Sequence, residues 1–203
     1  MFVQTIQGHI ADAGEMKDSI DQWMRDLAPG ARGWLGSTAG VASDGTFITV
    51  VRFESPEAAR RNSDRPEQHQ WWMETSKLFS GEVNFHNCEE VDQFGLGGSD
   101  DAGFVQVIQG RVRDVERMRE LGRRMETAGM NEFRPEVIGG TVALHGDGGY
   151  TMAVYFTSEQ AARQGERKEP PAELQALFEE EQQLHEGQPT YLDLSDPWLH
   201  SPR

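Results

Sequence analysis

Alternating apolar and polar residues open the chain, and the same short pattern returns about a hundred residues later. Residues 2–8 read FVQTIQG and residues 104–110 read FVQVIQG, which are identical at six of seven positions. Neighbouring residues of a strand point to opposite faces, so Val3, Thr5 and Gln7 are expected on one face of the first strand. The recurrence predicts that the protein is one structural unit present twice.

The first half continues with patterns typical of both helices and strands. Apolar residues at helical spacing predict a helix over residues 13–28, preceded by a capping residue, Asp12, and ended by Pro29-Gly30. Residues 33–42 and 46–54 read as a strand pair joined by a turn. A short helix at 55–62, a tryptophan-containing helix at 66–79 and a strand at 82–88 complete the order β-α-β-β-α-β.

The second half repeats this order after a glycine-rich stretch. Residues 95–103 read GLGGSDDAG, which predicts a flexible linker. FESPEAAR at 53–60 matches FTSEQAAR at 156–163 at five of eight positions, so two repeated segments occur in the same order. We therefore expect an N-terminal unit at 1–94, the linker at 95–103, and a C-terminal unit at 104–203.

The repeated unit has the order of a ferredoxin-like motif, whose antiparallel sheet carries helices on one face. A second such unit can cover the remaining face, so we predict an α+β fold in which two ferredoxin-like units form an intramolecular pseudo-dimeric α+β barrel. The opening strand, the hairpin ending in FESPEAA (53–59) and the helix with Trp71 and Trp72 resemble the dimeric α+β barrel superfamily. That group includes antibiotic-biosynthesis monooxygenases and haem-degrading monooxygenases. The resemblance covers nearly the whole chain, once per half, and implies that one chain supplies both halves of the barrel.

The resemblance also implies a site between the sheet and the helices of each unit. In the first half the catalytic candidates are Asn62, His69 and Trp72, and the substrate-binding candidates are Gln7, Trp34, Trp71 and Phe79. The polar groups would stabilise a substrate anion, His69 could act as a base, and the aromatic rings could form the pocket walls. The alternative for each aromatic residue is ordinary core packing, since aromatic side chains at helical spacing usually face the core.

Haem-degrading relatives place an asparagine on the first strand, a tryptophan at the Asn62 position and an iron-binding histidine about ten residues further on. The corresponding residues here are Gln7, Asn62 and Trp72, and His69 comes three residues too early. These departures disfavour haem binding or degradation. We predict neither a metal site nor a cofactor.

The second half differs from the first in these polar positions. An alignment without gaps places Gly165 opposite Asn62, and Ala172 to Gln175 opposite the run from His69 to Trp72. The site is therefore predicted in the first half. His145, Tyr150 and His185 are weaker candidates in the second half, and the run Glu179–Glu181 is interpreted as a solvated helix face.

Composition narrows the classes of function. The net charge of −15, from 34 acidic and 19 basic residues, disfavours binding to nucleic acids or to anionic membrane surfaces. Mean hydropathy is −0.64, and no apolar run approaches the roughly 18 residues of a membrane span. One cysteine, Cys88, and an N-terminus without signal-peptide features fit the cytoplasm.

The sequence thus predicts a cofactor-independent, monooxygenase-like protein that acts on a small aromatic or polyketide-like substrate. Its partner would be a small hydrophobic or aromatic ligand, and further oligomerisation of the pseudo-dimer stays open. Two alternatives remain. One is a non-catalytic, ligand-binding or stress-related α+β barrel, and the other, less favoured, is a haem-binding protein.

Overall fold

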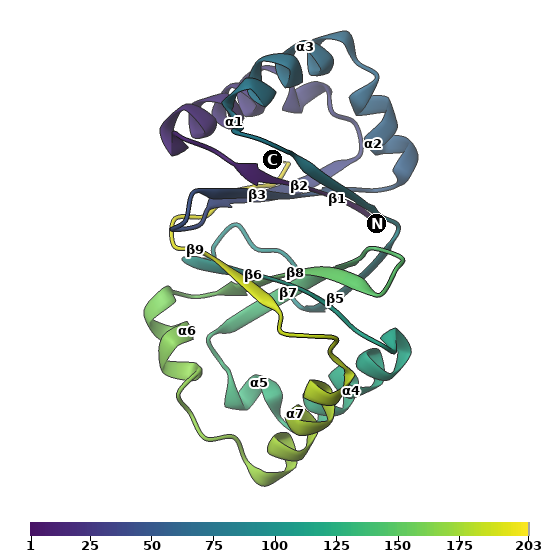
Figure 1. The fold of residues 1–203 in the computed structure, drawn as a ribbon, viewed down its shortest axis with the longest axis vertical. Helices are drawn as coiled ribbons and strands as arrows, with labels where there is room; N and C mark the ends of the chain where they lie inside the picture. Colours follow the sequence, from purple (N-terminus) through teal and green to yellow (C-terminus); the bar gives the residue numbers. More distant parts are fainter. Residues whose placement is uncertain (203) are drawn as a thin grey trace. The chain divides into compact units, whose positions relative to one another are not determined.

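The computed structural model describes residues 1–202, which form two compact units. Unit 1 consists of Met1–Val91 together with the C-terminal residues from Asp196 onward, and unit 2 consists of Asp92–Ser195. Each unit carries one five-stranded antiparallel sheet (Figure 1).

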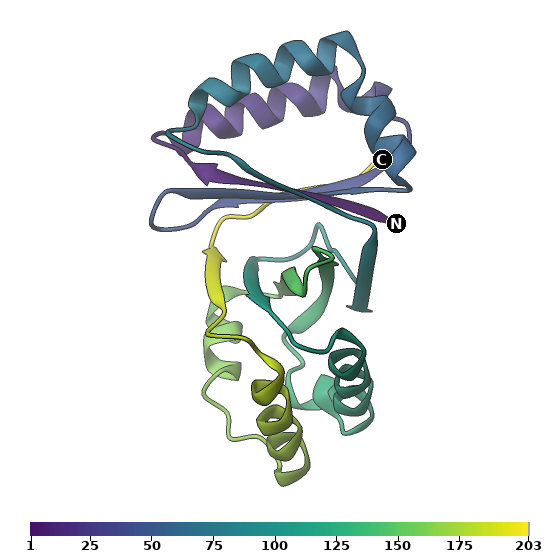
Figure 2. The same ribbon diagram turned by 45° about the vertical axis from the view of Figure 1, so that its right-hand side comes forward.

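Unit 1 has its strands in the order β10-β2-β3-β1-β4, and its helices cover one face of this sheet (Figures 1 and 2). Its longest strand pair joins β1 to β3 from Phe2 opposite Phe53 to His9 opposite Thr46. The elements are β1 Phe2–His9, α1 Ala13–Asp26, the 3-10 turn η1 Ala28–Gly30, β2 Trp34–Val41, β3 Thr46–Phe53, α2 Pro56–Ser63, α3 Pro66–Thr75, the 3-10 turn η2 Ser76–Leu78, β4 Asn84–Cys88 and β10 Trp198–His200.

Unit 2 has the order β5-β7-β8-β6-β9, again with helices on one face of the sheet. Its β6 pairs with β8 from Phe104 opposite Phe156 to Arg111 opposite Gly149, which repeats the pairing of β1 with β3. The elements are β5 Glu90–Gly95, β6 Phe104–Arg111, α4 Val115–Thr127, α5 Met130–Phe133, β7 Val137–Leu144, β8 Gly149–Phe156, α6 Glu159–Gly165, α7 Ala172–Leu184 and β9 Thr190–Leu194.

Both units therefore follow the β-α-β-β-α-β order, and the predicted α+β fold of two ferredoxin-like units is confirmed. The closure of the two sheets into one barrel concerns the placement of the units and stays a prediction. Among residues 1–202, no helix combines the length and the apolar character that a membrane crossing would require.

The fifth strand of each sheet comes from an unexpected part of the chain. β5 follows β4 after a single residue but pairs with β7, and β10 follows β9 but pairs with β2. Gly95, predicted in the linker, ends β5, and the tail beyond Asp196, predicted in the C-terminal unit, belongs to unit 1. The pairing covers one open edge of each sheet, where unpaired backbone groups would otherwise remain.

The repeated opening strand has the same structural role in both units. Gln4 donates from Nε2 to Asn87 Oδ1 at 2.9 Å, and Gln106 donates from Nε2 to Asp193 Oδ1 at 2.9 Å. The final glycine of each repeat allows a ring to approach the strand. A Cβ on Gly8 would lie 2.6 Å from a ring carbon of Phe79, and the corresponding Gly110 is closely approached by a ring of β8.

Candidate functional site

Asn62, a predicted catalytic residue, lies on α2 and is buried. Its Oδ1 accepts a hydrogen bond from Arg65 Nη1 at 2.9 Å, and the same Nη1 donates to the backbone oxygen of Leu27 at 3.0 Å. Arg65 thus joins the end of α1 to the start of α3, and Asn62 holds it in place. The geometry assigns Asn62 a structural contact that sequence alone did not show.

Unit 2 replaces this contact with an ion pair. Lys168 donates from Nζ to the backbone oxygen of Phe133 at 3.2 Å, as Arg65 donates to the backbone oxygen of Leu27 in unit 1. Gly165 stands where unit 1 has Asn62, and a Cβ there would lie 2.8 Å from the carboxyl carbon of Glu136. Because Gly165 has no side chain, there is room for the carboxylate of Glu136, which forms an ion pair with Arg134.

The predicted aromatic residues of unit 1 pack against one another. Trp34 is 6% exposed and lies edge-on to Trp23, with ring centroids 5.3 Å apart. Trp71 donates from Nε1 to the oxygen of Ser19 at 3.1 Å. The ring centroid of Trp72 lies 6.1 Å from that of Phe79, and Trp72 also contacts the ring of Phe85 on β4. Trp34 belongs to the hydrophobic core of unit 1, Trp71 and Phe79 pack against it, and Trp72 is half-buried beside them.

Two other predicted residues lie away from this cluster. His69 is exposed on α3. Gly8 faces Phe79 on the helix side of the sheet, so its neighbour Gln7 points to the opposite face. The structure brings Trp34, Trp71, Trp72 and Phe79 together. It separates Gln7 from Asn62, because Asn62 lies on α2 on the helix side of the sheet and Gln7 points to the other face.

Strand pairing shows which residues of the two units correspond. Outside the named strands, Ile10 pairs with Phe79 and Val112 pairs with His185. Phe85 lies opposite Ile6, as Tyr191 lies opposite Ile108, and Phe47 lies opposite Gly8, as Tyr150 lies opposite Gly110. Three phenylalanines of unit 1 therefore correspond to side chains of unit 2 that carry a polar group. Phe47 corresponds to Tyr150, Phe79 to His185, and Phe85 to Tyr191.

The same correspondence changes the alignment of the last helices. If His185 matches Phe79, then Phe178 matches Trp72 and Glu181 matches Thr75. Glu181 continues the stripe that faces the core of unit 2, formed by Leu174, Leu177, Phe178 and Leu184. This correspondence shifts the alignment without gaps by three residues. In the run predicted as a solvated face, Glu179 is exposed, whereas Glu180 and Glu181 are half-buried.

Glu180, the neighbour of Glu181, joins α7 to α4. Its carboxylate pairs with Arg117 and with Arg124, the latter at 2.9 Å between Nη1 and Oε2. Glu181 has no such partner: its carboxylate makes no hydrogen bond or ion pair with any residue between 1 and 202. Burial alone raises the pKa of Glu181.

Tyr150 faces the same region from β8. Burial raises the pKa of Tyr150 to about 12, and the charges of Glu181 and Tyr191 add to this effect. The Tyr150 ring lies 6.1 Å from that of His185, and the buried Nδ1 of His185 has no hydrogen-bond partner within residues 1–202. We call Tyr150, Glu181, His185 and Tyr191 the Glu181 cluster.

The remaining titratable candidates do not join this cluster. His145 lies with its Nε2 3.0 Å from Thr151 Oγ1, and Thr151 alternates with Tyr150 along β8 and so faces the other side of the sheet. Burial raises the pKa of Cys88 to about 11, which keeps the thiol protonated and unreactive. In the part of the chain that is described, no group of three or more histidine, cysteine or acidic residues could hold a metal ion.

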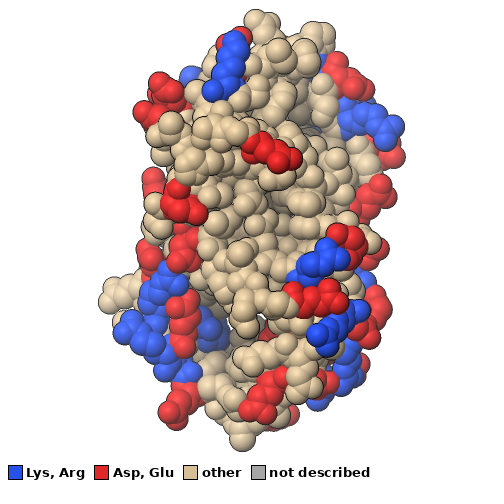
Figure 3. Space-filling view, viewed as in Figure 1, with Lys and Arg blue, Asp and Glu red and all other residues tan. Residues whose placement is uncertain are grey.

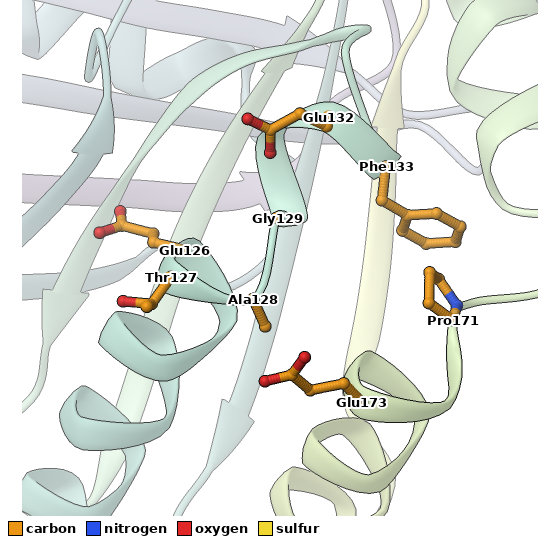
Figure 4. Close-up of a pocket in the computed structure, with 8 residues that line it drawn as sticks. All are labelled: Glu126, Thr127, Ala128, Gly129, Glu132, Phe133, Pro171 and Glu173. Carbon is orange, nitrogen blue, oxygen red and sulfur yellow. The ribbon is translucent and has the colours of Figure 1, made fainter.

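Two clefts lie near α4 and α7 of unit 2. The larger, of about 550 Å³, lies between the end of α4 with α5 and the start of α7 (Figure 4). The smaller, of about 430 Å³, is lined by residues of α4 and α7. Neither cleft is lined by a predicted site residue or by a member of the Glu181 cluster.

Charged residues on the visible surface form no extended patch of one sign. Most charged side chains gather toward the margins of the face shown, where acidic and basic groups lie next to one another, and much of the face between them is uncharged (Figure 3). Ion pairs of the chain include Arg119 with Asp92 at 2.7 Å and Lys17 with Asp21 at 2.9 Å.

Comparison with known proteins finds relatives by structure and not by sequence. No family model matches the chain, and no curated protein matches it. A proposed monooxygenase from Lactobacillus acidophilus NCFM superposes with a TM-score of 0.75 at 13% identity, covering 98% of this chain and 95% of the other. Another from Fusobacterium nucleatum gives a TM-score of 0.76 at 9% identity, covering 98% and 94%.

An anthrone oxidase-like protein is also similar, with a TM-score of 0.68 at 11% identity over 98% of this chain and 92% of the other. Sequence identities this low carry information about architecture only. The predicted resemblance to monooxygenase-like α+β proteins is thus confirmed at the level of the fold.

Proposed function

We propose that the protein is an oxygen-dependent oxidoreductase of the monooxygenase type, which acts on a small phenolic ring system at the Glu181 cluster. The observation that carries this proposal is the unpaired carboxylate of Glu181 on the core-facing stripe of α7, facing Tyr150. Glu181 is half-buried and burial raises its pKa, and titratable groups of this kind that lie near one another concentrate at functional sites. The shared fold with an anthrone oxidase-like protein supports the choice of substrate class.

The chemistry requires a base and groups that stabilise an anion. A raised pKa makes the carboxylate of Glu181 a stronger base than an ordinary glutamate, so it can remove a proton from a CH₂ group activated by a neighbouring ketone. Tyr150 and His185 would donate hydrogen bonds to the resulting enolate oxygen.

Oxygen then accepts electrons from the substrate carbanion. The CH₂ group becomes C=O, one oxygen atom enters the product, and the other leaves as water with the two hydrogens of the CH₂ group. The four electrons lost by carbon equal the four gained by O₂. The reaction therefore needs no external reductant, in keeping with a cofactor-independent oxidation.

The test is oxygen uptake with 1,8-dihydroxyanthrone, followed by absorbance of the anthraquinone product. We expect uptake above the rate in buffer, and a loss of about 10²-fold or more in Glu181→Gln, the range typical of a general base. Glu179→Gln is the matched control, since Glu179 is an exposed acid on the same helix. Wild-type protein that adds nothing to the buffer rate would exclude this function.

The same assay tests the site predicted in unit 1. If His69→Gln loses activity while Glu181→Gln keeps it, the reactive groups are Asn62, His69 and Trp72 after all. The exposure of His69 and the structural contact of Asn62 argue for the opposite outcome.

A second candidate function is binding of an aromatic ligand without catalysis. The position of both clefts away from the Glu181 cluster favours it, since a ligand bound in either cleft would not meet the proposed reactive groups. Binding of the anthrone without oxygen uptake would identify this case.

A further inference from the structure

We propose that unit 1 binds an extended basic peptide segment as an additional strand along the outer edge of β4. This surface is separate from the Glu181 cluster, and the inference does not depend on the proposed reaction. Three features of unit 1 carry it: the open backbone edge of β4, an exposed aromatic ring on that strand, and acidic residues at both of its ends.

β4 is the least protected of the four strands that form the edges of the two sheets. It spans Asn84–Cys88, pairs with β1 in regular register on one side, and has no neighbouring strand on the other. It contains neither a charged residue nor a proline, two devices by which proteins protect an open edge. By contrast, β5 and β9 contain acidic residues, and β10 has three residues and lies between Pro197 and Pro202.

The backbone on the outer side of β4 is available to a partner. Within residues 1–202, no backbone hydrogen bond joins residues 84–88 to any segment except β1. Asn84, Phe85 and Asn87 are exposed, so solvent reaches the strand. An extended peptide can pair with such an edge through its main chain, and its alternate side chains then lie on the two faces of the sheet.

Phe85 offers an apolar contact to such a strand. Its side chain is 44% exposed although it lies edge-on to Trp72, with ring centroids 5.4 Å apart. Trp72 is half-buried, so part of this aromatic pair remains in contact with solvent. Phe85 lies opposite Ile6 on the helix side of the sheet, and an added strand would place an apolar side chain beside it on the same face.

The charges around β4 indicate which kind of segment fits. Glu82 precedes the strand and Glu89 follows it; both are exposed, and neither forms an ion pair within residues 1–202. Of the cations on neighbouring elements, Lys77 pairs with Glu74 at 2.6 Å, and Arg52 of β3 is buried. Lysine or arginine at both ends of an added strand would therefore meet opposite charge.

A second copy of the chain fits this edge poorly. Antiparallel pairing of two β4 strands about His86 would place Glu82 of each chain opposite Glu90 of the other. Like charges that lie directly opposite one another destabilise a strand pair. The net charge of −15 adds to this repulsion, whereas it favours the approach of a basic segment.

The probe is a fluorescently labelled peptide of nine residues, with alternating threonine and valine in its centre and lysine at both ends. In an antiparallel pair its lysines lie opposite Glu82, Glu89 and Glu90, and its valines lie on the same face as Phe85. Fluorescence anisotropy with the full chain should show saturable binding of one peptide per chain. Hydrogen exchange should show added protection of the backbone amides of residues 84–88.

Two kinds of control peptide separate main-chain pairing from adsorption by charge. Replacing the lysines by glutamates should remove binding. N-methylation of one alternate set of backbone amides should weaken binding at least tenfold, because it removes the donors that face β4 and keeps every side chain. Methylation of the other set, which faces solvent, should weaken it less than twofold.

Variants of the chain test the charge argument. Glu82→Gln combined with Glu89→Gln should weaken binding of the lysine peptide at least threefold, the size expected for two exposed ion pairs. Glu132→Gln combined with Glu173→Gln makes the same change of net charge on exposed residues of unit 2 and should alter the affinity less than twofold. A thermal melt of each variant confirms that it is folded.

Several results would overturn the proposal: equal binding of the acidic peptide, equal binding of the two N-methylated peptides, or protection of an edge strand other than β4. A peptide-free chain that sediments as a dimer, and as a monomer in Phe85→Lys, would also overturn it, because a second copy would then occupy the edge. None of these measurements involves oxygen uptake, so their failure and the failure of the proposed function are distinguishable.

Discussion

Trp198 gives the sharpest test of the exchanged strands, because it is the main side chain by which the C-terminal segment joins unit 1. It is 7% exposed, packs with Ile10, Met16 and Phe47, and its backbone pairs with Ala39 of β2. If this packing is correct, Trp198→Ala should destabilise unit 1, although the residue is almost two hundred positions away from β1 in the chain.

The expected size follows from the area that the side chain buries. A tryptophan buries roughly 200 Å², which at about 25 cal/mol per Å² corresponds to about 5 kcal/mol as an upper estimate. Measured changes of buried aromatic residues to alanine fall at about 3–5 kcal/mol. Small domains unfold at a cost of about 5–15 kcal/mol, so the variant should lose a large part of the stability of unit 1.

The chain provides separate optical probes for its two units. All five tryptophans belong to unit 1: Trp23, Trp34, Trp71, Trp72 and Trp198. All three tyrosines belong to unit 2: Tyr150, Tyr155 and Tyr191. Urea unfolding followed by tryptophan fluorescence therefore reports on unit 1, and the four remaining tryptophans still report in Trp198→Ala.

The controls distinguish packing from general damage. Trp198→Phe keeps an aromatic ring against Phe47 and should lose less stability than the alanine variant. Removal of residues 196–203 should destabilise unit 1 at least as much as Trp198→Ala, and a synthetic peptide of that sequence should restore part of the loss. A decrease below about 1 kcal/mol for Trp198→Ala would refute the assignment of β10 to the core of unit 1, since burial of this size cannot cost so little.

Three further predictions concern single positions. Burial raises the pKa of Glu181 above its ordinary 4.5, so ionisation of this carboxyl weakens the folded state as pH rises through the folded pKa. Glu181→Gln should therefore gain stability relative to wild type between pH 4 and pH 8. A difference in urea midpoint that stays the same over this pH range would contradict the prediction. Gly8→Ala places a methyl group 2.6 Å from the ring of Phe79 and should cost about 1–3 kcal/mol in urea unfolding followed by tryptophan fluorescence, whereas wild-type stability would mean that the ring moves freely. The side chain of Arg111 donates to Asp147 and lowers the pKa of that carboxyl to about 2. An NMR titration should find this value in the wild type, and Arg111→Ala should return the pKa toward 3.8. Equal pKa values in both proteins would rule out the ion pair.

The fold could be predicted because its elements are encoded locally. The strand repeat FVQTIQG and FVQVIQG, the capping residues Asp12 and Ser55, and the apolar stripe of the first helix each determine a local structure. The order of these elements then leaves few ways to build an antiparallel sheet with helices on one face.

The exchanged strands could not be predicted in this way. Glu90–Gly95 and Trp198–His200 are short and lack a hydrophobic pattern of their own, so the sequence around them reads as a linker and a tail. Their structure depends on an edge strand of a sheet that is encoded elsewhere in the chain. Backbone pairing of this kind is available to almost any extended segment, and residue type says little about it.

The sequence by itself thus determined the two repeated segments and the ferredoxin-like order of each unit. Only the tertiary structure decided which titratable groups of unit 2 lie near one another. The pairing of Val112 with His185 moves α7 by three residues relative to a simple alignment. Glu181 then continues the core-facing stripe of α7, where it is half-buried and its charge helps to raise the pKa of Tyr150. A shift of three residues is almost one turn of a helix, so the same face of α7 still points to the core and the local residue pattern hardly changes. The size of the shift is set by the length of a loop and by the packing of two helices.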